Sequence, residues 1–185
     1  MSTPVEQDPG QRAVTPSDRE VVVERVFDAP RHLVWRAFTE PEQLAQWWGR
    51  GNKLLIEELE LWPGGRWRFV EHADDGVHGF EGRYREVTPP ERLVWTFAWD
   101  GMAGHAVLDT TTFEDLGDGR TKVVSHSLFQ TSEERDAMLG FGMQKGLDQS
   151  YAALDLLLAE AAGRDGWSES LDERAHTSIE EGRQA

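Results

Sequence analysis

Apolar residues near the end of the chain recur at the spacing of an amphipathic helix. The stretch from Gly142 to Gly163 carries apolar side chains three or four residues apart, at Met143, Leu147, Tyr151, Leu154 and Leu158. Residues at this spacing share one side of a helix that has 3.6 residues per turn. The pattern therefore predicts one helix over 142–163 whose apolar stripe is buried.

Most of the preceding chain alternates apolar and polar residues, which is typical of half-buried strands. Strands are expected over 20–27, 53–60, 66–71, 77–87, 92–99, 105–114 and 121–129. Prolines begin two short helices, over 30–38 and 41–48, and a capping box at Thr131 and Glu134 begins a third that ends near Leu139.

Short turns rich in Gly, Pro and Asp join the consecutive strands, which favours an antiparallel meander. The fold class is therefore α+β. We expect a helix-grip fold, in which a curved antiparallel sheet of about seven strands surrounds a long C-terminal helix, in the order β-α-α-β6-α. Such an arrangement commonly leaves a cavity between the sheet and the helix.

Composition indicates where the domain begins and ends and which classes of partner and chemistry are excluded. We expect a disordered tail over 1–18, one domain over 19–163 and an acidic, mobile tail over 164–185. The chain has 185 residues, no cysteine and a net charge of −15. The charge argues against nucleic-acid binding, and the lack of cysteine excludes disulfides and thiolate chemistry. No signal peptide and no membrane-spanning stretch is evident, so we predict no membrane insertion and a cytoplasmic protein.

Aromatic residues are concentrated in the middle of the chain. Six of them fall on one face of three successive strands, and three further residues, from the second short helix and the long helix, would face them. The predicted ligand-binding residues are Trp67, Phe69, Phe80, Tyr84, Trp95 and Phe97, with Trp48, Met143 and Leu147, and with Arg83 as a polar group that orients the ligand. They line either a cavity for a flat or lipid-like molecule or simply a filled core.

Two glycines in the long helix need a reason. A glycine inside a helix costs about 1 kcal/mol relative to alanine. Gly142 stands at the helix entrance, where this cost is low, but Gly146 lies further in. Close packing against the sheet and the preservation of space for a ligand both explain Gly146.

Residues with catalytic or metal-binding chemistry are sparse. Glu71, Arg83, His105, Asp109 and His126 fall on strands, but His105 and Asp109 would lie about 13 Å apart along one strand. The histidines and aspartates of the 72–78 turn, namely His72, Asp74, Asp75 and His78, are a weak zinc candidate. There is no phosphate-binding loop and no nucleophile elbow. We therefore predict no catalytic residue, no metal and no cofactor.

Several short motifs together resemble a known family. They are the Phe27–Pro30, Val34–Trp35, Phe38–Thr39 and Trp47–Trp48 segments, followed by Pro63–Gly65, Gly82–Tyr84, Pro90–Val94, Gly119–Thr121 and Gly142–Met143. As a set they resemble the AHSA1-like branch (activator of Hsp90 ATPase homologue) of the START-like, SRPBCC superfamily. The resemblance spans residues 20–162 and implies the helix-grip fold with a deep apolar cavity.

The resemblance leaves the function open, because a fold does not settle it. Relatives include lipid carriers, polyketide cyclases, co-chaperone domains and antibiotic-sequestering proteins. Our leading hypothesis is a non-enzymatic protein, monomeric or homodimeric, that binds a lipid, polyketide or similar metabolite. One alternative is a cyclase or hydrolase that uses the same pocket. The other is a stress-related or chaperone-regulating interaction module, against which the short polar N-terminal segment argues, since the eukaryotic co-chaperones carry a further domain there.

Overall fold

The computed structural model describes the backbone of residues 11–181 and the side chains of residues 13–163. The elements, in chain order, are β1 (Gln11–Val14), β2 (Glu20–Phe27), α1 (Arg31–Thr39), α2 (Pro41–Trp47), β3 (Lys53–Leu59), β4 (Arg66–Ala73), β5 (Gly76–Thr88), β6 (Arg92–Trp99), η1 (Asp100–Met102), β7 (Val107–Asp115), β8 (Thr121–Leu128), α3 (Ser132–Gly140) and α4 (Met143–Glu181). The strands form one antiparallel sheet in the order β1-β2-β8-β7-β6-β5-β4-β3.

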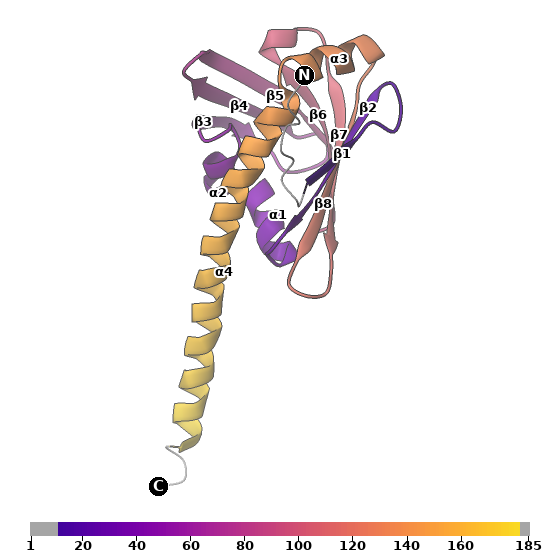
Figure 1. The fold of residues 1–185 in the computed structure, drawn as a ribbon. Coiled ribbons are helices and arrows are strands. Elements are labelled where there is room, and N and C mark those ends of the chain that lie inside the picture. Colours follow the sequence, from indigo (N-terminus) through magenta and orange to yellow (C-terminus); the bar gives the residue numbers. More distant parts are fainter. Residues whose placement is uncertain (1–10, 182–185) are drawn as a thin grey trace, which may run out of the picture.

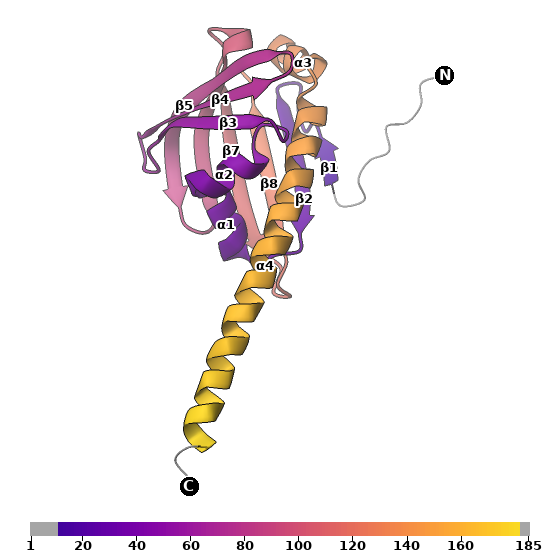
Figure 2. The ribbon, with the colours of Figure 1, turned by 90° about the vertical axis from the view of Figure 1, so that its left-hand side faces the viewer.

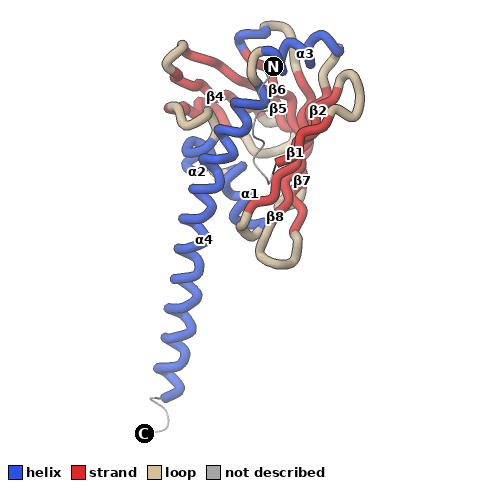
Figure 3. Tube along the Cα trace, in the orientation of Figure 1, coloured by secondary structure: helices blue, strands red, loops and turns tan. Residues whose placement is uncertain are grey.

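The sheet curves, and α1, α2 and α4 all cover its concave face (Figure 1, Figure 2). This arrangement confirms the predicted α+β helix-grip fold. The tube view shows strands on both sides of the first part of α4, with β4 on one side and β1, β2, β7 and β8 on the other (Figure 3).

The sheet has eight strands, not the expected seven. The additional strand, β1, pairs antiparallel with β2, so that Gln11 lies opposite Arg25 and Val14 opposite Val22. It falls within the 1–18 segment that we expected to be disordered. Four residues are too few to show an alternating pattern, and this is why the sequence did not reveal the strand. Residues 1–10 of the expected tail lie outside the described residues.

The helix α4 also extends further than predicted, because it continues past Gly163 to Glu181. A glycine costs a helix about 1 kcal/mol, which does not by itself end it, and Gly163 and Gly166 both lie within α4. The expected boundary at residue 163 was therefore wrong as a helix end. The side chains of the predicted acidic tail, 164–185, lie outside the described ones.

The second half of the domain part of α4 fastens the helix to the sheet. Tyr151, Leu154 and Leu158 are buried, and the Tyr151 ring meets the edge of Phe27 with 5.4 Å between centroids. Arg25 on β2 forms an ion pair with Asp155 on α4. These contacts fix the position of the whole helix, including its first half.

The short helices fill the far end of the concave face. In α1, Leu33, Val34, Ala37 and Phe38 are buried, and the Phe38 ring lies 5.1 Å from that of Phe113 on β7. These contacts follow from the predicted apolar face of the helix. They close one end of the sheet, so that any empty space remains under the first half of α4.

Candidate ligand-binding cavity

A cavity of about 460 Å³ lies between the concave face of the sheet and the first half of α4. It answers the question that the aromatic pattern left open, because the rings surround empty space as well as packing on one another. Trp48, for example, contacts Phe69 and Phe80 edge to face, at centroid distances of 5.3 and 4.8 Å. A volume of this size is in the range of small-molecule sites.

The structure brings nine of the ten predicted ligand-binding residues to the cavity wall. They are Trp48, Trp67, Phe69, Phe80, Tyr84, Trp95, Phe97, Met143 and Leu147. Strict alternation explains the strand residues, since side chains two apart point to the same face. A bulge in β5 between Tyr84 and Glu86 shifts the register only beyond Tyr84, which therefore stays inside opposite Trp95.

Arg83 is the tenth predicted residue, and it lies outside the cavity. It is exposed on the outer face of β5, where its guanidinium donates a hydrogen bond to the carbonyl of Gly64 at 3.0 Å. The reason is the same alternation, because neighbours on a strand point to opposite faces and Tyr84 points inward. The suggestion that Arg83 orients a ligand was therefore wrong.

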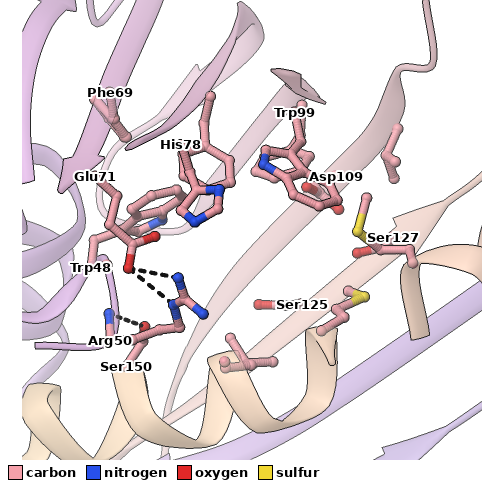
Figure 4. Close-up of a pocket in the computed structure, with 18 of the residues that line it drawn as sticks. Trp48, Arg50, Phe69, Glu71, His78, Trp99, Asp109, Ser125, Ser127 and Ser150 are labelled. Carbon is pink, nitrogen blue, oxygen red and sulfur yellow. Dashed lines mark hydrogen bonds and ion pairs between the residues drawn. The ribbon is translucent and has the colours of Figure 1, made fainter. Parts of the chain in front are cut away.

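A buried ion pair stands at one end of the cavity. Glu71 on β4 is 1% exposed, and its Oε1 accepts hydrogen bonds from Arg50 Nε at 3.0 Å and Asn52 Nδ2 at 2.6 Å. The Arg50 backbone N–H in turn donates to Ser150 Oγ on α4 at 3.2 Å (Figure 4). The loop between α2 and β3, which carries Arg50 and Asn52, thus connects α2 with β4 and α4.

The loop that carries Arg50 has an unusual backbone. Arg50 has a φ of 60°, and its neighbours Gly49 and Gly51 have φ values of 92° and 83°. This left-handed conformation is strained for a residue with a side chain. It directs the Arg50 side chain back over the sheet, where the guanidinium forms an ion pair with Glu71.

Arg50 also explains Gly146. A Cβ at position 146 would lie 3.3 Å from Cδ of Arg50, closer than nearly all ordinary contacts. Gly146 therefore makes room for the arginine side chain, which neither of our two explanations had foreseen. Gly142 has a φ of 89° and turns the chain between α3 and α4.

Polar side chains form a second group at the opposite end of the cavity (Figure 4). Asp109 on β7 lies between Trp95 on β6 and Ser127 on β8 in the strand register. The next row joins Thr111 Oγ1 to Ser125 Oγ at 3.4 Å, and Ser125 Oγ to the Tyr151 hydroxyl at 3.1 Å. We call these five polar residues (Asp109, Thr111, Ser125, Ser127 and Tyr151) the polar floor.

Burial changes the ionisation of the polar floor. It raises the pKa of Asp109 from 3.8 to about 6, although hydrogen bonds from Ser127 and Trp95 and the charge of His126 act in the opposite direction. Burial also raises the pKa of Tyr151 to about 12. Burial in the cavity thus disfavours the ionised form of Asp109.

Of the remaining sequence candidates, His105 and His126 are paired away from the cavity, and His72 and His78 point to different faces. His105 Nδ1 lies 2.6 Å from Glu134, and His126 Nε2 lies 2.7 Å from Glu20. The hairpin register places His78 opposite Glu71 but His72 opposite Val77, so the two imidazoles point to different faces. His78 pairs with Asp75 at 3.0 Å. Within the described residues, no group of three or more potential metal ligands comes together.

The polar floor is what sequence reasoning missed. On β7, Asp109 and Thr111 share the inward face with Val107 and Phe113, and on β8, Ser125 and Ser127 share it with Val123 and Phe129. Each strand therefore has two polar residues in the middle of an inward-facing apolar row. This pattern could have revealed the polar floor, since a buried polar group needs a partner or a ligand. We had paired Asp109 only with His105, on the same strand.

Comparison with known proteins places the chain in a family. The model of the family described as "Activator of Hsp90 ATPase homolog 1-like protein" matches residues 28–159. The chain belongs to the AHSA1 family. The match confirms the resemblance carried by the sequence motifs. Among curated proteins, none matches this sequence.

Solved structures of bacterial proteins share the AHSA1-family fold seen here. A Rhodobacter sphaeroides protein has 27% identity and a TM-score of 0.73, over 81% of this chain and 98% of its own. A Chromobacterium violaceum protein has 29% identity and a TM-score of 0.64, over 75% and 96%. A Mycobacterium smegmatis protein, at 20% identity and a TM-score of 0.73 over 81% and 97%, supports the fold alone. In the part of the chain that the structure describes, no helix is long and apolar enough to cross a membrane.

Proposed function

We propose that this AHSA1-family protein binds an apolar small molecule in the cavity between its sheet and α4. The observation that carries the proposal is an aromatic-lined space of about 460 Å³ with polar groups restricted to its two ends. Natural small-molecule sites have this composition, in which apolar walls supply affinity and a few polar groups fix orientation.

The expected affinity follows from burial. Removing roughly 300 Å² of apolar ligand surface from water contributes about 7 kcal/mol at 25 cal/mol per Å². Losses of motion and of hydration on binding offset part of this. Without these losses, about 7 kcal/mol would correspond to a dissociation constant of roughly 10 μM, so we expect weaker binding than this, which calorimetry at high ligand concentration can measure.

The entrance is proposed at the rim where exposed side chains also line the cavity. Asp75, in the β4–β5 turn, has a side chain 69% exposed, and Phe141, between α3 and α4, is 64% exposed. Phe141 meets the edge of Trp99 at a centroid distance of 5.4 Å. A ligand would pass between this corner and the turn.

Native mass spectrometry and calorimetry with a panel of lipids, polyketides and aromatic amphiphiles test the proposal. Leu147→Trp fills the cavity from α4 and is expected to abolish binding. Leu156→Trp is the matched control, because Leu156 lies on the same helix but is 71% exposed. If no member of the panel binds the wild-type protein, or if Leu147→Trp binds as well as the control, the proposal fails.

One observation favours a second function, a cyclase or hydrolase acting in the same cavity. Asp109 faces the cavity and has a pKa of about 6, which suits a group that gives and takes protons. This function requires that Asp109→Asn abolish turnover of some bound ligand. The interaction-module alternative requires an exposed apolar patch and a filled core, and the cavity argues against the second of these.

A further inference from the structure

The charges that face the cavity are unbalanced. Three carboxylates line it, on Glu71, Asp75 and Asp109, against the single guanidinium of Arg50. Arg50 is bound to Glu71 at 2.9 Å, and Asp75 is held by His78. Asp75 is largely exposed to solvent, so Asp109 is the carboxylate inside the cavity without a cationic partner in the lining.

Asp109 stands far from the arginine in the sheet. Glu71 and Arg50 meet on β4, whereas Asp109 is on β7, with β5 and β6 between them. Its neighbours across the strands are Trp95 and Ser127, whose indole N–H and hydroxyl are donors on the same face of the sheet. An ionised carboxylate accepts about four hydrogen bonds, so two donors leave capacity for a ligand.

We propose that the cavity selects amphiphilic organic cations, such as amines with an apolar body, whose ammonium group binds Asp109. This inference rests on the proposed function and names its ligand class. An ammonium group donates hydrogen bonds to the carboxylate and neutralises its charge. The aromatic wall, which includes Phe97 and Trp99, supplies ring faces that attract cations.

The same arrangement disfavours other amphiphiles. A fatty acid or a phosphate ester would bring a second anion to Asp109, and the bound arginine is at the other end of the cavity. A neutral alcohol donates one hydrogen bond without removing the charge. The expected order of affinity is therefore ammonium, then alcohol, then carboxylate, with about tenfold between the first two.

Three probes with the same decyl chain, decylammonium, decanol and decanoate, test the order by calorimetry near neutral pH. We expect Asp109→Asn to weaken decylammonium about tenfold and to change decanol by less than about twofold. Glu114→Gln is the control for overall charge, because it removes one exposed carboxylate from the same strand. It should leave all three affinities unchanged.

The outcomes separate the two proposals. If none of the three probes binds but a member of the broader panel does, the proposed function stands and selection of cations is wrong; if nothing in the panel binds either, the proposed function fails. If decanol or decanoate binds the wild-type protein as tightly as decylammonium, apolar binding stands but selection of cations is wrong. This comparison needs no variant, so it holds even if Asp109→Asn folds poorly. Equal weakening by Glu114→Gln would also overturn the role of Asp109, since it would show a general charge effect.

Discussion

Replacing Asp109 by Asn should make the empty protein more stable at neutral pH. The pKa of Asp109 is about 6 in the folded protein against its usual 3.8, so the folded state holds this proton more tightly than the unfolded chain. The ionised carboxylate therefore destabilises the fold. Its cost is absent below the unfolded pKa, grows as the pH rises between the two values and is complete above the folded one.

The magnitude follows from the two pKa values. A difference of roughly two corresponds to about 3 kcal/mol at 1.36 kcal/mol for each pKa unit. Asn has nearly the same shape, keeps an acceptor for Ser127 and Trp95, and carries no charge. We therefore expect Asp109→Asn to raise the free energy of unfolding by about 2–3 kcal/mol above the folded pKa, and by nearly nothing below the unfolded pKa.

Urea unfolding of both proteins, followed by tryptophan emission across this pH range, measures the difference. His126 from β8 and Tyr151 from α4 are the titratable groups whose charges act with that of Asp109, and they are the same in both proteins. Glu114→Gln again serves as the control. A difference that does not change with pH, or a loss of stability above the folded pKa, would refute the reasoning.

Four further substitutions test the Arg50 loop and the sheet by urea or thermal unfolding. Arg50→Ala leaves the buried Glu71 carboxylate without its cation. The free energy of unfolding should fall by about 2 kcal/mol, because Arg50 is partly exposed, and adding Glu71→Gln should restore part of this loss. Gly146→Ala should stabilise the Arg50→Ala protein by about 1 kcal/mol but the wild type by less, because the new Cβ lies 3.3 Å from Arg50; equal gains would contradict the contact. Gly82→Ala should cost several kcal/mol, because its Cβ would lie 1.7 Å from the Thr96 carbonyl oxygen; a change below about 1 kcal/mol would mean that the strands separate easily.

Local patterns were sufficient to find the aromatic wall of the cavity. Trp67 and Phe69, and likewise Trp95 and Phe97, are two residues apart, and this spacing alone places each pair on one face. The assignment of Arg83 to the cavity contradicted this alternation, since its neighbour Tyr84 was already assigned to the inner face. The rule also held for Asp109, but its inward direction became meaningful only beside Ser127 and Trp95, which belong to other strands.

Contacts between distant segments could not be found in this way. Gly146 looked like a helix feature, yet its reason is the side chain of Arg50, nearly a hundred residues earlier. That contact depends on the left-handed backbone of Arg50 and on where α4 crosses the sheet. Neither is visible in the spacing of apolar residues, because spacing describes one element at a time.

The sequence by itself determined most of the elements, the inner and outer faces of most strand residues and the family, because alternation and helical spacing are properties of neighbouring residues. Only the tertiary structure decided that the aromatic face encloses empty space. Residues 151–158 of α4 are fixed to the sheet by Tyr151, Leu154 and Leu158, while residues 143–150 span the concave face of a sheet that curves away from them. The distance between them depends on the curvature of the whole sheet, and this distance leaves room for a ligand.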